Sequence, residues 1–178
     1  LKPRNILVGA GDRIRLIDFG IAQQATDADG RTQVTLTGNV VGTPQYMSPE
    51  QAEGRLDAMG PTSDIYSLGA TLYTILTGTS PFEGPDLHTV LRRVIAGEFP
   101  SPRHVVRRVP RALEAICLKA MALRPEERYA TSRALAQDIE RWLADESVSA
   151  RRELWPSHAR RWLRHRPGAL PWVMIVLV

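Results

Sequence analysis

Asp18-Phe19-Gly20 and Gly42-Thr43-Pro44-Gln45-Tyr46-Met47-Ser48-Pro49-Glu50 are the two motifs on which the interpretation of the whole chain depends. A polar, threonine-rich segment separates them, and a third motif, Leu1-Lys2-Pro3-Arg4-Asn5, precedes both. Each motif alone recurs by chance in unrelated proteins. Their order and spacing along one chain are far more specific, so residues 18–50 are interpreted as a functional loop with a motif at each end.

Together these motifs resemble the catalytic loop, the magnesium-binding triplet, the activation loop and the Ala-Pro-Glu-type motif of the protein kinases. The resemblance extends from Leu1 to about Leu143 and points to the bacterial membrane-anchored (eukaryotic-like) serine/threonine protein kinases. It implies a mainly α fold, the C-terminal lobe of the α+β kinase fold, with a short β-hairpin near the N-terminus. The glycine-rich loop, the strand lysine, its glutamate partner and the catalytic aspartate are expected upstream of Leu1, the aspartate immediately before it.

The composition is that of an ordinary soluble globular core, with 178 residues of which 43% are hydrophobic and 24% charged. The single cysteine, Cys117, cannot form an intrachain disulfide and favours a reducing, intracellular setting. Much of the net charge of +4 comes from arginines crowded near the C-terminus, so it indicates a local basic segment. The chain begins inside a motif and stops within an apolar run, and we expect both ends to be cut from a longer protein.

Two short apolar segments around Gly9-Ala10-Gly11-Asp12 predict a β-hairpin. The glycines do not form a G-x-G-x-x-G phosphate loop, because Ile14 occupies the third glycine's position. Asn5 precedes the first strand and Asp18 ends the second, so both side chains can emerge at the same end of the hairpin. An amide oxygen and a carboxylate are donors that Mg²⁺ prefers, although both residues could instead cap turns.

The resemblance implies that these residues bind ATP with Mg²⁺, or with Mn²⁺ in its place. Asp18 would chelate the ion that bridges the β- and γ-phosphates, and Asn5 would hold the second ion. Lys2 would steady the γ-phosphate during transfer, and Leu7 would lie under the adenine ring. Lys2, Asn5, Asp18 and Thr43 are therefore the candidate catalytic residues.

The segment that follows the structural residues Phe19 and Gly20 shows no sustained hydrophobic period and is expected to be a surface loop. In the kinases such a loop is ordered by phosphorylation. The resemblance makes Thr35 and Thr37 candidate autophosphorylation sites, with a merely polar, solvated loop as the alternative. Thr43 matches the threonine near the substrate hydroxyl and the catalytic aspartate, and together with Lys2 it disfavours tyrosine specificity.

Ser48 and Pro49 predict the start of a short helix, with Ser48 as its N-cap. By resemblance, Glu50 forms a buried, architectural ion pair with Arg128. Asp64 stands at the start of an apolar helical segment and would hydrogen-bond the catalytic-loop backbone. An ordinary helix N-cap is the local alternative for Asp64.

The remaining sequence predicts helices. Apolar residues at spacings of three and four predict a helix that is buried almost all round and ends at Gly78; they are Ile65, Leu68, Leu72, Ile75 and Leu76. Further helices are expected over 86–96, 110–123 and 131–143, and the core face of the last comprises Leu135, Ile139, Trp142 and Leu143. His88 and His104 lack partners at metal-ligand spacing and are expected on the surface.

The chain is accordingly divided into a kinase C-terminal lobe (1–144), a basic juxtamembrane linker (145–168) and the start of a truncated transmembrane helix (169–178). A span needs about 20 apolar residues, so only its beginning is present. Arginines before the apolar run and Trp172 near its entry predict a single-pass protein of the cell membrane with a cytoplasmic kinase domain. A nucleic-acid-binding arm and a strand packed on the domain are the alternatives for this tail.

By resemblance, the parent protein transfers the ATP γ-phosphate to Ser/Thr hydroxyls of proteins in signalling, and the present chain alone is inactive. The expected partners are protein substrates, ATP, the membrane and a second kinase copy, but no nucleic acid. Two rival classes are a pseudokinase-type scaffold and a membrane- or nucleic-acid-binding module built on the tail. Lys2, Asn5 and Asp18 argue against the scaffold, because a scaffold need not keep magnesium ligands.

Overall fold

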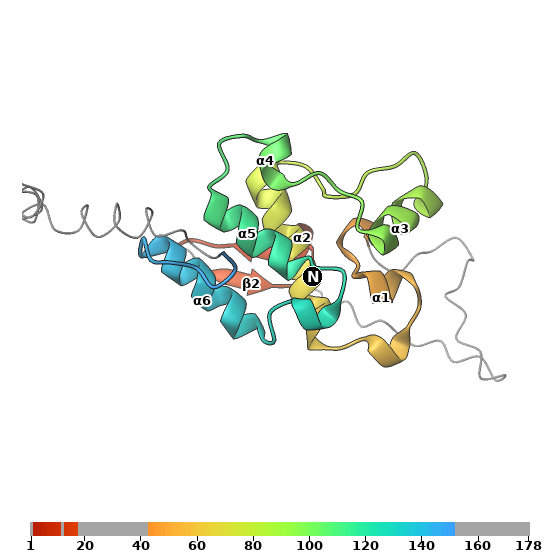
Figure 1. Cartoon of the computed structure of the whole chain (residues 1–178), viewed down its shortest axis with the longest axis horizontal. Helices are drawn as coiled ribbons and strands as arrows, with labels where there is room; N and C mark the ends of the chain where they lie inside the picture. Colours follow the sequence, from red (N-terminus) through yellow and green to blue (C-terminus); the bar gives the residue numbers. More distant parts are fainter. Residues whose placement is uncertain (1, 12, 18–42, 152–178) are drawn as a thin grey trace, which may run out of the picture.

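The computed structural model describes residues 2–11, 13–17 and 43–151 (Figure 1). As predicted, the fold is mainly helical, with one two-stranded sheet near the N-terminus. Asp18, Phe19, Gly20, Thr35, Thr37 and the predicted membrane segment 169–178 lie outside the described residues. The described elements are the strands β1 (Ile6–Val8) and β2 (Ile14–Leu16), the helices α1 (Pro49–Ala52), α2 (Pro61–Thr77), α3 (Leu87–Ala96), α4 (Pro102–Val105), α5 (Arg111–Ala120) and α6 (Ser132–Leu143), and the 3₁₀ turns η1 (Pro3–Asn5), η2 (Pro44–Tyr46), η3 (Leu56–Ala58) and η4 (Pro125–Glu127).

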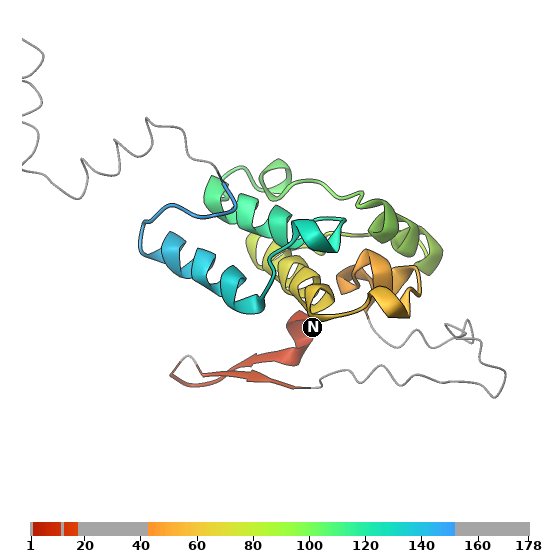
Figure 2. The ribbon, with the colours of Figure 1, turned by 60° about the horizontal axis from the view of Figure 1, so that its bottom comes forward.

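The predicted β-hairpin is confirmed. β1 and β2 pair antiparallel, with Ile6 opposite Leu16 and Val8 opposite Ile14. Gly11 closes the turn with a φ of 71°, a left-handed conformation that glycine adopts without steric cost. In Figure 2 the hairpin lies to one side of the helices. Its apolar side chains are consequently open to solvent, with Val8 71% and Ile14 67% exposed.

Helix α2 is the central element, and it begins earlier than Asp64. Gly60 is its N-cap and Pro61 its first residue, a position where the fixed φ of proline suits the helix. Asp64 therefore lies in the first turn, and its interpretation as an N-cap is wrong. The helix ends at Gly78, whose φ of 79° is left-handed, as predicted.

Two groups of buried side chains pack on different sides of α2. Tyr66 and Tyr73 join a cluster with residues around α3, including Phe82 and Val94. Ile65 joins a second cluster formed mainly by α5 and α6. Figure 2 shows the same arrangement, with α2 between the α5–α6 pair and the α1–α3 side. The expectation that α2 is buried almost all round holds for most of the helix, but Ile75 is 73% exposed because it faces neither cluster.

Helix α5 crosses α2 at very short range. A Cβ atom placed on Gly69 would lie 2.8 Å from Ala120 Cβ and 2.8 Å from Met121 Cγ. The buried Cys117 thiol donates a hydrogen bond of 3.5 Å to the Gly69 carbonyl. The missing side chain at Gly69 therefore sets how closely the two helices approach.

The predicted boundaries of the other helices agree with the structure at their N-termini. Asp86 caps α3 by accepting a hydrogen bond of 2.7 Å from the Thr89 N–H, and Thr131 caps α6 in the same way. The prediction that α5 continues to residue 123 is wrong. The helix ends at Ala120, and Met121 is its C-cap. Farther on, Arg124 precedes a proline and is extended, a conformation that proline favours in its predecessor.

The end of the described chain folds back on the lobe. Leu143, predicted to be in the core, is 71% exposed, whereas Val148 is 3% exposed and belongs to the α5–α6 cluster. Packing therefore continues past Ala144, where the sequence predicts the linker to begin. Among the helices of the described residues, none is both long and apolar enough to cross a membrane.

Candidate active site

The N-terminal motif forms a tight turn that leads directly into β1. Lys2 is extended and half-buried, and its carbonyl accepts a hydrogen bond of 2.9 Å from the Asn5 N–H. Pro3 opens η1, where its lack of an N–H costs nothing. The turn buries Asn5 to 8% exposure, so the backbone holds this side chain in a fixed place.

The backbone also relates Asn5 to the end of β2. The Asn5 carbonyl accepts a hydrogen bond of 2.8 Å from the Ile17 N–H, one step beyond the Ile6–Leu16 pair. Ile17 is the residue before Asp18. Asp18 itself is outside the described residues, so the prediction that Asn5 and Asp18 place two oxygen ligands at one end of the hairpin stays a prediction. Within the described ranges, no group of three or more His, Cys, Asp or Glu side chains could hold a metal ion.

Leu7 and Thr43 have different surroundings. Leu7 is 49% exposed on β1, so an apolar face is available there. Thr43 is half-buried and precedes η2. The segment after Thr43 is tied to α2, because the Tyr46 carbonyl accepts a hydrogen bond of 2.8 Å from the Ser67 hydroxyl. The Tyr46 hydroxyl also lies 3.2 Å from Thr74 Oγ1.

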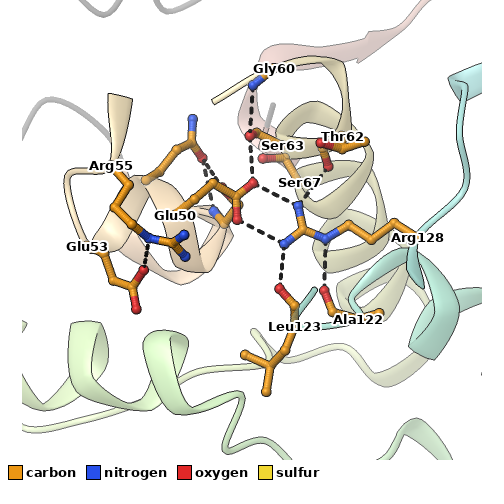
Figure 3. A network of polar contacts seen from close by, with 12 residues as sticks. Glu50, Glu53, Arg55, Gly60, Thr62, Ser63, Ser67, Ala122, Leu123 and Arg128 are labelled. Atoms are coloured by element: carbon orange, nitrogen blue, oxygen red, sulfur yellow. Dashed lines mark hydrogen bonds and ion pairs between the residues drawn. The ribbon is translucent and has the colours of Figure 1, made fainter. Parts of the chain in front are cut away.

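Glu50 and Arg128 form a fully buried ion pair (Figure 3). Two parallel hydrogen bonds of 2.8 and 2.9 Å join the guanidinium to the carboxylate. The remaining donors of Arg128 reach the carbonyls of Thr62, Ala122 and Leu123 at 2.8 to 3.0 Å. All five N–H groups of the guanidinium are thereby used, which is what allows this charge to be buried.

The surroundings keep Glu50 ionised. Burial alone raises the pKa of its carboxyl, but hydrogen bonds from Arg128 and Ser63 lower that pKa to about 2. The Ser63 hydroxyl donates to Glu50 Oε1 at 2.6 Å. The Arg128 guanidinium also lies 5.0 Å from the centre of the Tyr66 ring, within the range of a cation–π contact. The pair therefore connects α1, the start of α2 and the approach to α6.

Asp64 stands apart from this network. It is exposed, in the first turn of α2. Its hydrogen bond to the catalytic-loop backbone stays a prediction. His88 and His104 are exposed, as the sequence predicts.

A second polar centre, which the sequence patterns did not predict, surrounds Asp138, a residue that is 1% exposed. Its carboxylate accepts hydrogen bonds of 2.8 Å from the Tyr129 hydroxyl, the Ser149 hydroxyl and the Ser149 N–H, and one of 3.0 Å from the Ala150 N–H. Burial raises the pKa of Asp138, but these donors together lower it. The available signal was a carboxylate within the apolar stripe of α6, between Leu135 and Ile139.

Comparison with known proteins identifies the fold that carries these features. The family described as "Protein kinase domain" matches residues 1–139, most of the chain. The chain belongs to the protein kinase family. The match includes the Asn5 turn, the hairpin and the Glu50–Arg128 pair.

Kinases of several bacteria are similar to this chain. The serine/threonine-protein kinase PknB of Mycobacterium leprae is 43% identical over 141 residues, which are 78% of this chain and 22% of the relative. The serine/threonine-protein kinase PrkC of Bacillus subtilis is 39% identical over 139 residues, 78% of this chain and 20% of the relative. The tyrosine-protein kinase MasK of Myxococcus xanthus is 39% identical over 145 residues, which are 82% of this chain and 22% of the relative. The chain thus spans about a fifth of the length of these curated relatives.

Proposed function

We propose that this chain is the C-terminal lobe of a longer kinase that transfers the γ-phosphate of ATP to serine or threonine hydroxyls of protein substrates. The observation that carries the proposal is the Asn5 turn, which holds a buried amide side chain beside the end of β2 within a chain of the protein kinase family. Catalysis of this transfer depends mainly on positioning and on stabilisation of charge.

The residues fit a bound magnesium nucleotide. Asn5 and Asp18 offer an amide oxygen and a carboxylate, both hard donors. The N–H of Ile17, the residue before Asp18 in the sequence, donates a hydrogen bond to the Asn5 carbonyl. When bound, Mg²⁺ neutralises charge on the ATP phosphates. Lys2 would hold the γ-phosphate by its positive charge, and the exposed Leu7 would contact the adenine ring.

Thr43 supports a serine/threonine acceptor. It lies directly before the segment that Tyr46 fixes to α2, so its position relative to the lobe is well defined. The names of the relatives do not decide the acceptor, since PknB and PrkC are named serine/threonine-protein kinases and MasK a tyrosine-protein kinase. Thr35 and Thr37 are proposed as phosphorylation sites of the loop.

The tail supports attachment to the cell membrane. Residues 169–178 are almost entirely apolar and follow a segment rich in arginine, the charge pattern of a cytoplasmic flank. The proposal places the kinase lobe in the cytoplasm, with residues 145–168 as the linker to a membrane helix that starts at residue 169.

The test measures transfer of ³²P from γ-labelled ATP to a serine-containing and to a tyrosine-containing protein substrate. The longer kinase should label only the former, whereas the 178-residue chain alone should be inactive. Asp18→Asn should lower the rate at least about 100-fold, because metal stabilisation of the transition state is worth several kcal/mol. The exposed Asp57→Asn is the matched control and should leave the rate unchanged. Equal rates for Asp18→Asn and Asp57→Asn would contradict the proposal.

A further inference from the structure

Positive charge is segregated on one part of the lobe. Residues 103–111 contain Arg103, Arg107, Arg108 and Arg111 and no acidic residue. Around this stretch the balance is reversed, since residues 43–102 and 112–151 hold 14 acidic and 9 basic side chains. We call these four arginines the α4–α5 arginine patch, because they lie on α4, on the loop after it and on the first residue of α5.

Three of the four side chains of the α4–α5 arginine patch are open to a partner. Arg107, Arg108 and Arg111 are exposed, and Arg103 is half-buried. None of the four forms an ion pair with an acidic side chain of the described residues. Arginines elsewhere in the lobe do so, as in the Arg92–Glu98 and Arg124–Glu127 pairs. A cluster of charges of one sign creates a local potential that attracts a partner of the opposite charge.

The patch lies beside the point where the described chain ends. Val148 and Ala150 pack in the same cluster as Ala112 and Leu113, the residues that follow Arg111. Figures 1 and 2 both show the blue end of the described chain next to the green start of α5. The hydrogen bonds from Ser149 and Ala150 to Asp138 hold this end in place. The exit of the chain and the arginine patch are therefore fixed relative to one another.

We propose that the α4–α5 arginine patch binds the anionic lipid headgroups of the membrane to which the tail attaches, so that the lobe lies against the membrane with α4 and the start of α5 facing it. The proposal rests on the membrane attachment proposed above. Basic side chains near an anionic leaflet are attracted to it over about a Debye length, roughly 8 Å at physiological ionic strength.

The short segment between the lobe and the proposed membrane helix favours lipid headgroups over other anionic partners of the patch. The 17 residues from 152 to 168 can span at most roughly 60 Å, so a membrane-attached tail keeps the patch at a high effective concentration near lipid. Single-stranded nucleic acid is a poorer match, because residues 103–111 contain no Phe, Tyr or Trp on which bases could stack. The half-buried Arg151 adds a further positive charge at the exit.

The experiment places a fluorophore within the patch and a quencher on the lipid headgroups. Val105→Cys provides an attachment point that is 40% exposed, whereas the native Cys117 is buried and burial raises the pKa of its thiol to about 12. The longer kinase, which supplies the rest of the membrane span, is reconstituted into vesicles of phosphatidylcholine, with or without phosphatidylserine. Quenching should be stronger with phosphatidylserine and should be lost at about 1 M salt, where the Debye length is about 3 Å.

Arg107→Glu combined with Arg108→Glu should reduce quenching to the level seen with phosphatidylcholine alone, and the milder Arg107→Gln with Arg108→Gln should give an intermediate value. Arg124→Glu combined with Arg133→Glu is the charge-matched control on exposed residues outside the patch and should quench like the parent chain. The circular dichroism of each variant shows that it is folded.

Three results would overturn the inference in different ways. Flotation of the chain with both vesicle types, but with equal quenching, would reject the arginine patch and leave membrane attachment intact. Failure to float with either type would reject the membrane attachment itself. Binding of random-sequence duplex DNA that the Arg107/Arg108 reversal removes, without any lipid effect, would assign the patch to nucleic acid instead.

Discussion

Glu50 and Arg128 are separated by 78 residues in the sequence and are joined by two hydrogen bonds between side chains with no exposed surface. Glu50 is the second residue of α1, and Arg128 stands before the last described helix, α6. The pair therefore fixes α1 to the helical body of the lobe. Its geometry predicts how the lobe responds to loss of either partner.

Glu50→Gln should lower the free energy of unfolding by about 3–5 kcal/mol. The substitution preserves the shape of the side chain but leaves the buried Arg128 charge without its counter-charge. Urea unfolding followed by circular dichroism measures the loss. Glu53→Gln is the control, because Glu53 pairs with Arg55 at the surface, where such pairs contribute at most about 1 kcal/mol. A similar decrease in the free energy of unfolding for both variants would contradict the claim that the buried ion pair stabilises the lobe more than the exposed one does.

The same carboxyl predicts a pH dependence of stability. The pKa of Glu50 is lowered from an ordinary value of 4.5 to about 2. The unfolded chain therefore binds a proton at higher pH than the folded one does, and acid favours unfolding. The stability that Glu50 contributes is complete above about pH 5 and is lost as the pH falls toward 2. In Glu50→Gln the urea midpoint should decline less steeply across this pH range than it does in the parent chain. The same decline in both would show that protonation of Glu50 does not cause the loss of stability.

Much of the fold could be predicted because local patterns carry it. The glycines of the hairpin, the caps Asp86 and Thr131, and the left-handed Gly78 each act within a few residues. The sequence predicted core positions less well at Ile75 and Leu143. Burial depends on which neighbours pack on each side of a helix, and helical periodicity does not contain that information.

The candidate site could be predicted only in part. The family resemblance led to the Glu50–Arg128 pair, a contact across 78 residues that no local pattern reveals. Asp138 was missed because an aspartate in an amphipathic helix is usually solvated, and its partners Ser149 and Ala150 lie beyond the helix end. The roles of Lys2, Asn5, Asp18 and Thr43 in catalysis remain predictions until transfer is measured.

Gly69→Ala should destabilise the lobe although alanine is the better helix former. The new methyl group would lie 2.8 Å from Ala120 Cβ, a distance that forces α2 and α5 apart. Overpacking of this kind costs about 1–3 kcal/mol and outweighs the gain of roughly 1 kcal/mol in helix propensity. Thermal and urea unfolding should both show the loss. Ile75→Ala, on the exposed side of α2, is the control and should change stability by less than about 0.5 kcal/mol.

Asp138→Asn should release the end of the chain from the lobe. An amide has a single acceptor oxygen, so its NH₂ group would face N–H or O–H donors that now bond to the carboxylate. Leaving one such buried donor without a partner costs about 1–3 kcal/mol. We expect this loss of stability to be largest in residues 148–150, which the carboxylate holds against the lobe. Amide hydrogen exchange at Ser149 and Ala150 should accelerate far more than exchange in α2.

The exposed Glu140→Gln, on the same helix, is the control for Asp138→Asn and should leave exchange at Ser149 and Ala150 unchanged. Uniform acceleration of exchange across the lobe would show that Asp138 supports the whole fold and not the chain end specifically.

Accelerated exchange confined to Ser149 and Ala150 has a consequence for how the lobe lies on the membrane. The hydrogen bonds at Asp138 fix the exit of the chain beside the α4–α5 arginine patch. In vesicles that contain phosphatidylserine, Asp138→Asn should then broaden the distribution of distances between the Val105→Cys label and the lipid surface.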